Sequence, residues 1–472
     1  MDSDGSSLRA APTWTAEAVG GVRHSRFAGI HGTGFQRQAI RQNDSILKGT
    51  TLALTRKMRM KLNKPIQLLA ATAVSLLAAT FLSSCNQLTQ TLTVDFVYVS
   101  SAKAAGPNNY GEIDVFEINS ESGRMRQIPT SPFFSGGRNP VAEAASPDQA
   151  DLYVVNRDDN SIVQFIIGSD GKLYPQNTVN TPGIFPLAVS VSGNYLYVVD
   201  LYQPLPTCNP AAPCSGSIAV FPILTAAQAK ALTPAQPADT LGSPIANASI
   251  NANYWPLSLP GAIATDVFVP TAVTTASSGA YVYVAGYDST TNIGYVFGFA
   301  SGSDGTLSVI PGFPLQVGSH PSAVASEKSG TYLYITDSTN DVVYGYQIAD
   351  GALTALSGSP YQAGASPSAI AVDATTKFAV VANAQDSNVT VYSISSGSLT
   401  RLGTYTTGIQ PVAIGIDPRL NKFVYTANFL GNNVSGFELQ NDGSLLNSQF
   451  SPSAANANPT AVAAITHNGS TN

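Results

Sequence analysis

Hydrophobic and polar positions follow one another along most of the chain in a pattern that repeats seven times. Each repeat contains a short run of aromatic and β-branched residues, which is typical of a buried strand. The seven runs are 96–100, 152–156, 196–200, 282–286, 333–337, 379–383 and 424–428. A second run follows each of them, at 113–118, 162–167, 218–223, 294–299, 342–348, 389–394 and 434–439. The pattern therefore predicts seven repeated groups of strands.

Turn signals and prolines complete each group. Six of the second runs lead into a turn with Gly, as in Asp170-Gly171 and Asp304-Gly305, and Asp-Gly between strands predicts a hairpin. A third phrase consists of Pro with Ala two residues later, and the recurrence of this small residue indicates a crowded position. The prolines are Pro140, Pro186, Pro270, Pro321, Pro367, Pro411 and Pro459. Their spacings of 46, 84, 51, 46, 44 and 48 residues fit the length of a propeller blade.

The order of the phrases predicts how the ring closes. The first group begins at Phe96 without a Pro-x-Ala phrase, whereas the chain ends on such a phrase with nothing after it. We therefore predict an all-β fold, a seven-bladed β-propeller of four-stranded antiparallel blades, in which strand 459–465 completes the first blade and protects its edge. The long spacing places an insertion, residues 201–269, in the third blade. Such an insertion serves either function or packing.

The N-terminal part of the chain reads as a targeting segment. A basic run at 58–64 precedes an apolar stretch at 66–82, and 82–85 ends on Ser-Ser-Cys, which resembles the lipobox of bacterial lipoproteins. The resemblance implies a signal peptide at 58–84 and a lipid on Cys85, with the cell envelope as the location. The alternative is an uncleaved membrane anchor.

The remaining segments outside the repeats show few sequence patterns that predict helices or strands. Residues 1–57 are a disordered leader or lie before the true start. Residues 85–94 form a linker, the propeller spans 95–466 and residues 467–472 are a tail.

The charge of the chain limits the kinds of partner that it can bind, and its cysteines predict a disulfide. The whole chain has a net charge of −6, but from Cys85 onward 12 Lys and Arg stand against 25 Asp and Glu, a balance that disfavours nucleic acid as a partner. Cys208 and Cys214 remain as an even pair, and in an oxidising compartment they predict a disulfide. The alternative for this pair is free thiols or a metal site. The sequence contains no cofactor motif, and we expect neither a cofactor nor a bound metal.

The Pro-x-Ala-Val phrase followed by Tyr-Leu-Tyr-Val and an Asn or Asp resembles the lactonase-like seven-bladed propellers. This group includes bacterial 6-phosphogluconolactonases and YVTN-type surface repeats, and the resemblance covers about 95–466. It implies the propeller fold and, for the enzyme members, hydrolysis of a lactone. Those members carry His-rich and Arg-rich stretches and a Glu near the inner strands, where this chain has mostly Asn, Asp, Ser or Gly. This difference favours inheritance of the scaffold.

Three residues are candidates for catalysis at the channel mouth. His320 is the only His inside the repeats, and as a general base it could activate water against a lactone carbonyl. Glu143 occupies a position that is Val or Ile in the other six repeats, so it should find an Arg or line the channel. Arg138 and Arg157 are its nearest cations in repeat position. The alternatives are an ordinary loop His and a structural ion pair.

Further polar residues at the same end are candidates for ligand binding. Arg157, Asp158, Asp159 and Asp288 lie where the second strand joins the third, and the two neighbouring acids do not recur in the other repeats. By contrast, Asn or Asp recurs at the end of five second strands, which indicates a turn cap.

Taken together, the sequence predicts an exported, lipid-anchored propeller that acts as a binding module through its channel-mouth face. The expected partner is a small-molecule lactone or an envelope protein or glycan, and contact with the membrane is through the lipid alone. The first alternative is a lactone hydrolase that uses His320 with Glu143 or Arg138. The second is a passive surface protein.

Overall fold

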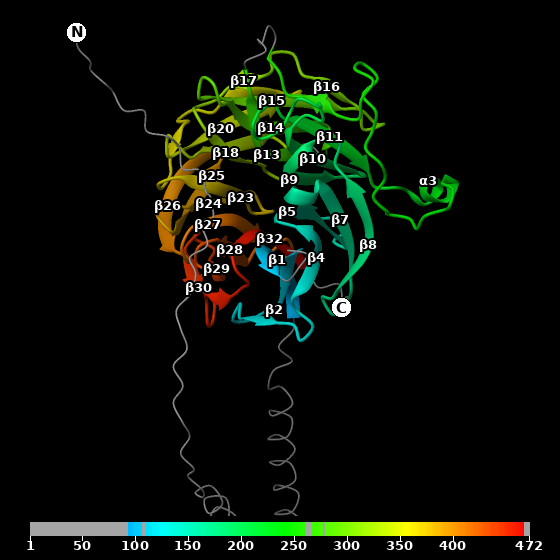
Figure 1. Cartoon of the computed structure of the whole chain (residues 1–472). Helices are drawn as coiled ribbons and strands as arrows, with labels where there is room; N and C mark the ends of the chain where they lie inside the picture. Colours follow the sequence, from blue (N-terminus) through cyan, green and yellow to red (C-terminus); the bar gives the residue numbers. More distant parts are fainter. Residues whose placement is uncertain (1–92, 106–109, 260–265, 277–278, 467–472) are drawn as a thin grey trace, which may run out of the picture. The chain divides into compact units, whose positions relative to one another are not determined.

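The computed structural model describes residues 93–105, 110–259, 266–276 and 279–466. The predicted leader, the signal peptide, Cys85, most of the linker and the tail lie outside these residues. The described strands form seven antiparallel sheets arranged in a ring, as the repeats predicted (Figure 1). No helix in this part of the chain is long and apolar enough to cross a membrane.

The innermost strand of each blade lines the centre of the ring. Each innermost strand contacts the innermost strands of both neighbouring blades, which closes the circle. From blade 1 to blade 7 they are β32 (Pro459–Thr466), β5 (Pro140–Ala145), β9 (Ile184–Ser192), β13 (Phe268–Ala276), β18 (Pro321–Ser326), β23 (Pro367–Val372) and β27 (Pro411–Ile416).

The second and third strands carry the buried core of each blade. In the same order, the second strands are β1 (Thr93–Ala105), β6 (Asp151–Asn156), β10 (Tyr195–Tyr202), β14 (Tyr281–Asp288), β19 (Tyr332–Asp337), β24 (Phe378–Asn383) and β28 (Phe423–Asn428). The third strands are β2 (Tyr110–Asn119), β7 (Ser161–Ile167), β11 (Ser217–Pro222), β15 (Ile293–Ser301), β20 (Val342–Ala349), β25 (Asn388–Ser395) and β29 (Asn433–Leu439).

The fourth strand is the least regular. It is β3 (Met125–Gln127), β8 (Leu173–Asn180), β12 (Trp255–Pro256), β16 (Leu307–Val309), β21 (Ala352–Ala355), β26 (Ser398–Thr406) and β30 (Leu445–Asn447). In four blades a separate short segment also pairs with the third strand. These segments are β4 (Phe133–Arg138), β17 (Leu315–Gln316), β22 (Tyr361–Gln362) and β31 (Ser453–Ala454).

Ring closure follows the prediction. The C-terminal strand β32 pairs antiparallel with β1, with Phe96 opposite Ile465 and Val99 opposite Val462. Blade 1 therefore combines strands from the two ends of the described chain, and β1 has no free edge.

The Pro-x-Ala phrase has a structural reason in the register of the innermost strands. In all seven, the pairing shifts by one residue between the Pro and the Ala, so that the residue between them forms a β-bulge. Where that residue is Ser or Thr, its hydroxyl donates a hydrogen bond to the Pro carbonyl of the next blade. The four cases are Thr271 to Pro321 (2.7 Å), Ser322 to Pro367 (2.6 Å), Ser368 to Pro411 (2.7 Å) and Thr460 to Pro140 (2.7 Å).

Neighbouring blades meet at seams built by aromatic residues. At six of the seven seams, an aromatic residue early in the second strand packs closely against a turn Gly of the next blade. Its ring occupies the space that a Cβ atom on that Gly would need. The pairs are Phe96 with Gly171, Tyr195 with Gly305, Tyr281 with Gly351, Tyr332 with Gly397, Phe378 with Gly443 and Phe423 with Gly123. These glycines have positive φ, so the backbone of the turn and the neighbouring aromatic ring both exclude a side chain at this position. A buried Tyr two residues further on adds a hydrogen bond to the next blade at four seams.

The insertion of blade 3 consists of two excursions on either side of β11. The first, residues 203–216, joins β10 to β11. The second, residues 223–254, contains the short helix α3 (Ala226–Ala231) and folds back over blade 2. There Gln164 donates to the Asp239 carbonyl (2.8 Å) and accepts from the Leu241 amide (2.8 Å), and Leu241 is buried in the core between blades 2 and 3. This excursion replaces the hairpin that other blades use at this seam.

Candidate functional site

Two groups of loops meet at the mouth of the channel. One group holds the residues that precede the innermost prolines, and the other joins the second strand to the third. In five blades, an amide of the second group donates to the carbonyl of the residue before the proline. The pairs are Ala102 with Asn458, Arg157 with Asn139, Ser338 with His320, Ala384 with Ser366 and Phe429 with Gln410, at 2.8–3.0 Å. The predicted site residues on these loops therefore do share one end of the ring.

The recurrent Asn and Asp residues cap these loops. The carboxylate of Asp337 accepts hydrogen bonds from the amides of Ser319 (2.6 Å) and Thr339 (2.9 Å), and that of Asp200 accepts from Gly183 (3.2 Å). Asn383 accepts from the Gly364 amide at 3.0 Å. These contacts hold the mouth loops in place, as the recurrence indicated.

Arg138 is held by the acids of blade 2. Its guanidinium forms an ion pair with Asp159 at 2.5 Å, and Asp159 also accepts the Arg138 amide at 2.7 Å. The hydrogen bond and charge of Asp159 raise the pKa of Arg138. Asp158 and Asp159 belong to the 3-10 helix η1 (Arg157–Asp159), so Arg138 fixes this helix against the end of β4. Neither partner is left free for a ligand.

Arg157 is differently placed. Its guanidinium lies over the ring of Phe185 in blade 3 at 5.0 Å, and its Nε lies 4.0 Å from the Asp158 carboxylate. The buried Nε has no hydrogen-bond partner among the described residues. Phe185 in turn contacts Tyr202, with ring centroids 6.2 Å apart. We call Arg157, Phe185 and Tyr202 the Arg157 stack; it presents a half-exposed cation on an aromatic support.

His320 forms a similar stack on another part of the ring. Its imidazole lies 4.2 Å from the Tyr287 ring between centroids, and its Nδ1 is buried without a hydrogen-bond partner among the described residues. Tyr287 and Arg157 occupy equivalent positions, directly after the second-strand cap, and His320 and Phe185 both precede a proline. We call Tyr287 and His320 the His320 stack.

Glu143 lies on β5 and contacts blade 1. Ser100 donates a hydrogen bond to one carboxylate oxygen, and the other oxygen is buried without a partner in the described part of the chain. Burial, only partly offset by the hydrogen bond from Ser100, raises the pKa of Glu143 to about 7. No ion pair joins it to Arg138 or Arg157 in the described residues. The reason is geometric: its position faces the preceding blade, whereas both arginines lie on the mouth loops.

Asp288 is a turn cap. Its carboxylate accepts hydrogen bonds from the Thr290 amide (2.9 Å) and the Thr291 hydroxyl (2.7 Å). Burial acts to raise the pKa of Asp288, but these hydrogen bonds outweigh it and hold the pKa below its usual value. A carboxylate satisfied in this way has little left to offer a ligand.

The three candidate catalytic residues do not converge. Arg138 ends β4 in the sheet of blade 1 and reaches the acids of blade 2, Glu143 lies at the seam between blades 1 and 2, and His320 lies in blade 5, across the ring. No described contact joins His320 to either of the others. The described residues contain no group of three or more His, Cys, Asp or Glu side chains that could hold a metal ion.

The sequence did not single out the aromatic partners. Phe185, Tyr202 and Tyr287 carry the two stacks, yet only their repeat positions could have identified them. At the equivalent positions the other blades have mostly small or amide residues, such as Ser338, Ser366 and Gln410, and one further aromatic residue, Phe429. An aromatic residue at these positions is therefore the signal that a comparison of the repeats could have used.

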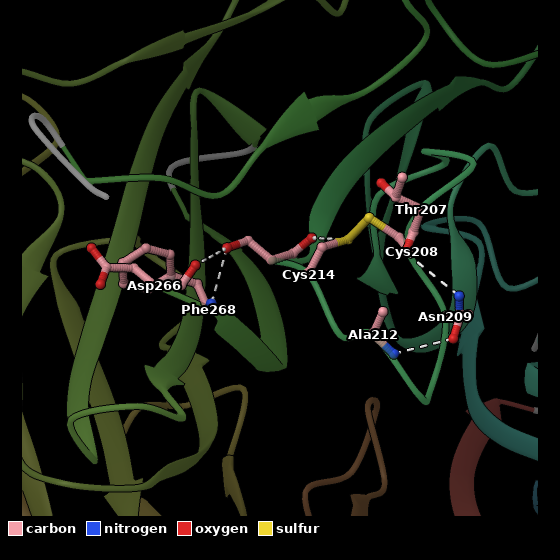
Figure 2. Close-up of a disulfide and its surroundings, with 8 residues drawn as sticks. Thr207, Cys208, Asn209, Ala212, Cys214, Asp266 and Phe268 are labelled. Carbon is pink, nitrogen blue, oxygen red and sulfur yellow. Dashed lines mark hydrogen bonds between the residues drawn. A yellow bond between two sulfur atoms is a disulfide. The ribbon is translucent and has the colours of Figure 1, made fainter. Parts of the chain in front are cut away.

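A disulfide stands at the same end of the ring. Cys208 and Cys214 are bonded, as predicted, with Cα atoms 5.4 Å apart (Figure 2). Next to Cys214, the Ser215 hydroxyl donates to the Asp266 carbonyl (3.2 Å) and accepts from the Phe268 amide (3.1 Å). The disulfide closes the loop 203–216, and Ser215 fastens it to the start of β13.

Comparisons with known proteins agree with this architecture. Residues 109–201 and 302–416 match the family described as "Lactonase, 7-bladed beta-propeller". A search of curated protein sequences gives no significant match.

Solved structures share the fold at low sequence identity. A candidate 6-phosphogluconolactonase of Bacteroides fragilis is 18% identical over 80% of this chain and 99% of its own, with a TM-score of 0.61. The periplasmic gluconolactonase of Pseudomonas aeruginosa is 18% identical over 79% of this chain and 99% of its own, with a TM-score of 0.58. The two matched segments and the seven-bladed ring show that the chain resembles the lactonase-like seven-bladed β-propellers, and the solved structures share its fold.

Proposed function

We propose that the protein is an exported, lipid-anchored propeller that binds a ligand at its channel mouth through the Arg157 stack and the His320 stack. The observation that carries this proposal is the separation of the candidate catalytic groups: Arg138 is neutralised by Asp159, and Glu143 and His320 contact different blades. What the mouth offers instead is a half-exposed guanidinium, a half-buried imidazole and aromatic rings. These groups suit a ligand with an anionic group and a flat apolar face.

Binding can be measured directly. Titration calorimetry of residues 86–472 with aldonates and aromatic carboxylates, each beside an uncharged analogue, should give affinity for the charged member that Arg157→Ala weakens about tenfold or more. Arg126→Ala is the matched control, because Arg126 pairs with Glu117 on an outer strand and its side chain is 73% exposed. Equal loss in both variants, or equal affinity for charged and uncharged ligands, would contradict the proposal.

Export and anchoring rest on separate observations. The disulfide between Cys208 and Cys214 fits an oxidising compartment, and one structural neighbour is a periplasmic protein. We propose Cys85 as the lipidation site, from the sequence that precedes it. In a bacterial host, an alkyne fatty acid should label the full chain and leave Cys85→Ser unlabelled. Labelling that survives this substitution would refute the anchor.

Lactone hydrolysis is the second candidate. It is favoured by the names of the structural neighbours and by Glu143, whose pKa of about 7 suits a general acid or base. Proton release from a panel of aldonolactones and aromatic lactones, corrected for spontaneous hydrolysis, tests it. Turnover that disappears in His320→Ala or Glu143→Gln would establish an enzyme. No rate above background would leave the binding role alone.

A further inference from the structure

The seam between blade 7 and blade 1, where the ring closes, contains two buried carboxyl groups that face each other. Asp95 is the first residue of β1 that pairs with β32, and it lies opposite Thr466, the last residue of β32. Asp417 lies in the turn between β27 and β28 of blade 7. Both residues are 0% exposed, and their side chains lie within hydrogen-bonding reach of one another.

The two carboxyl groups differ in their other partners. Asp417 accepts hydrogen bonds from the amides of Arg419 (2.9 Å) and Leu420 (3.0 Å). Neither carboxylate oxygen of Asp95 receives a hydrogen bond from the described residues. Two ionised carboxylates in contact without water are strongly unfavourable, whereas one proton between them makes a charge-assisted hydrogen bond. The arrangement therefore suits a protonated Asp95 that donates to the Asp417 carboxyl group.

The surrounding charges do not neutralise a second anion. Burial, followed by repulsion from Asp417, raises the pKa of Asp95 to about 8, and Arg419 is the cation that opposes this shift. Tyr425 faces both acids, and its hydroxyl is buried without a partner in the described part of the chain. The nearby Lys422 pairs with Glu438 at 3.3 Å.

The remaining charged groups on this side line a hollow of about 370 Å³ that Asp417 also lines. They are Lys328 and Asp373.

Asp95 is also a departure from the repeat. Counted back from the residue that pairs with the innermost proline, the equivalent residues of blades 2 to 7 are Ala150, Asn194, Ala280, Thr331, Lys377 and Lys422. Asp95 is thus the one acid at this place, and it occurs at the seam that joins the two ends of the propeller.

We propose that Asp95 and Asp417 form a proton-dependent latch at the closing seam. Their shared proton holds the ends of β1 and β32 against blade 7, and each opening of the seam releases it. The sign follows from linkage: an open seam exposes an Asp95 that ionises near pH 4, while the closed seam keeps the proton up to about pH 8. Rising pH therefore loosens this seam across that range, and the effect levels off above it.

Hydrogen exchange of residues 86–472 at pH 5 to 9, corrected for intrinsic rates, tests the latch. The opening constant of the β32 amides should rise with pH by up to about tenfold per unit, the slope for one released proton, and flatten above pH 8. Amides of β23 in blade 6 serve as the internal reference. Asp95→Asn and Asp417→Asn should each remove the excess slope on β32, whereas Asp442→Asn, an exposed acid of blade 7, should leave it.

The wild-type protein alone can overturn the proposal, so the outcome does not depend on whether a variant folds. Equal pH slopes for β32 and β23 would refute it. So would an excess slope that persists in Asp95→Asn. Neither result bears on ligand binding at the mouth, which lies at the other end of the channel.

Discussion

The seams of the ring are of two kinds, although the repeats around them look alike. At the seams between blades 4 and 5 and between blades 5 and 6, an aromatic ring covers a turn Gly, and a buried Tyr donates to the carbonyl of that same Gly. Tyr283 donates to Gly351 and Tyr334 to Gly397, both at 2.8 Å. At the seams between blades 2 and 3 and between blades 7 and 1, the equivalent hydroxyls of Tyr153 and Tyr425 have no partner among the described residues.

Both irregular seams also contain a buried acid with a raised pKa, as does the otherwise regular seam between blades 1 and 2 with Glu143. At the seam between blades 2 and 3, Asp151 takes the place of the aromatic residue, and burial raises its pKa to about 6. At the closing seam, Asp95 has a pKa of about 8. These two seams are where the chain departs from simple repetition, through the insertion in one case and ring closure in the other. Regular packing at a seam therefore requires that both of its blades follow the repeat.

The largest effect should come from removing the closing strand. A chain that ends at Asn458 loses β32, including the buried Ile465, and leaves the edge of β1 unpaired. We expect it to lose the cooperative unfolding transition in circular dichroism and to aggregate on size exclusion. A chain that ends at Thr466 is the control and should unfold like the full propeller. Cooperative unfolding of the shorter chain would show that the closing seam is dispensable.

Loss of the disulfide should have a smaller effect. Cys208→Ser with Cys214→Ser opens a short loop, and the entropy of closing such a loop accounts for at most about 2 kcal/mol of stability. Because the loop lies outside the seams, the slope of a urea unfolding curve should stay the same while its midpoint falls. A changed slope would show that the disulfide supports the ring itself.

Glu143→Val should make the seam between blades 1 and 2 regular. It removes a buried carboxyl whose second oxygen has no partner, and we expect a gain of about 1–2 kcal/mol at pH 8. The folded pKa of about 7 lies above the ordinary 4.5, so wild-type stability falls as pH rises between these values. The advantage of the variant should therefore grow from pH 5 to pH 7 and then level off in urea unfolding. A constant advantage would mean that Glu143 ionises normally.

The smallest expected effect on stability comes from a direct comparison of two tyrosines. Tyr334→Phe removes a hydrogen bond between blades and should cost about 1 kcal/mol, while Tyr425→Phe removes a hydroxyl without a partner and should be neutral or slightly stabilising. Denaturant midpoints of the two variants, measured side by side, decide this. Equal costs would mean that the two seams do not differ in the way described here.

The sequence predicted the fold well because the same physical requirement recurs seven times. The number of blades, the pairing of β1 with β32 and the position of the insertion all follow from phrases that repeat at fixed spacing. The disulfide followed from counting cysteines. The bulge in each Pro-x-Ala phrase did not, because a register shift depends on how two strands pair and a single strand does not reveal it.

The site was predictable only in part. The repeats place the predicted residues on loops between strands, but the contacts of their side chains depend on how one blade is rotated against the next. Arg138 with Asp159, Glu143 with Ser100 and Arg157 over Phe185 each join separate segments of chain. No spacing in a single sequence encodes such pairs.

The hydrogen bond from Thr460 to the Ser100 carbonyl spans 360 residues and sets an order of events during synthesis and folding. Of the seven described blades, blade 1 is the first to begin leaving the ribosome and the last to be completed, because its innermost strand is made after the strands of the other six. Blades 2 to 7 can assemble in sequence while β1 waits with an open edge. The exposure of that edge therefore lasts as long as the rest of the propeller takes to be made.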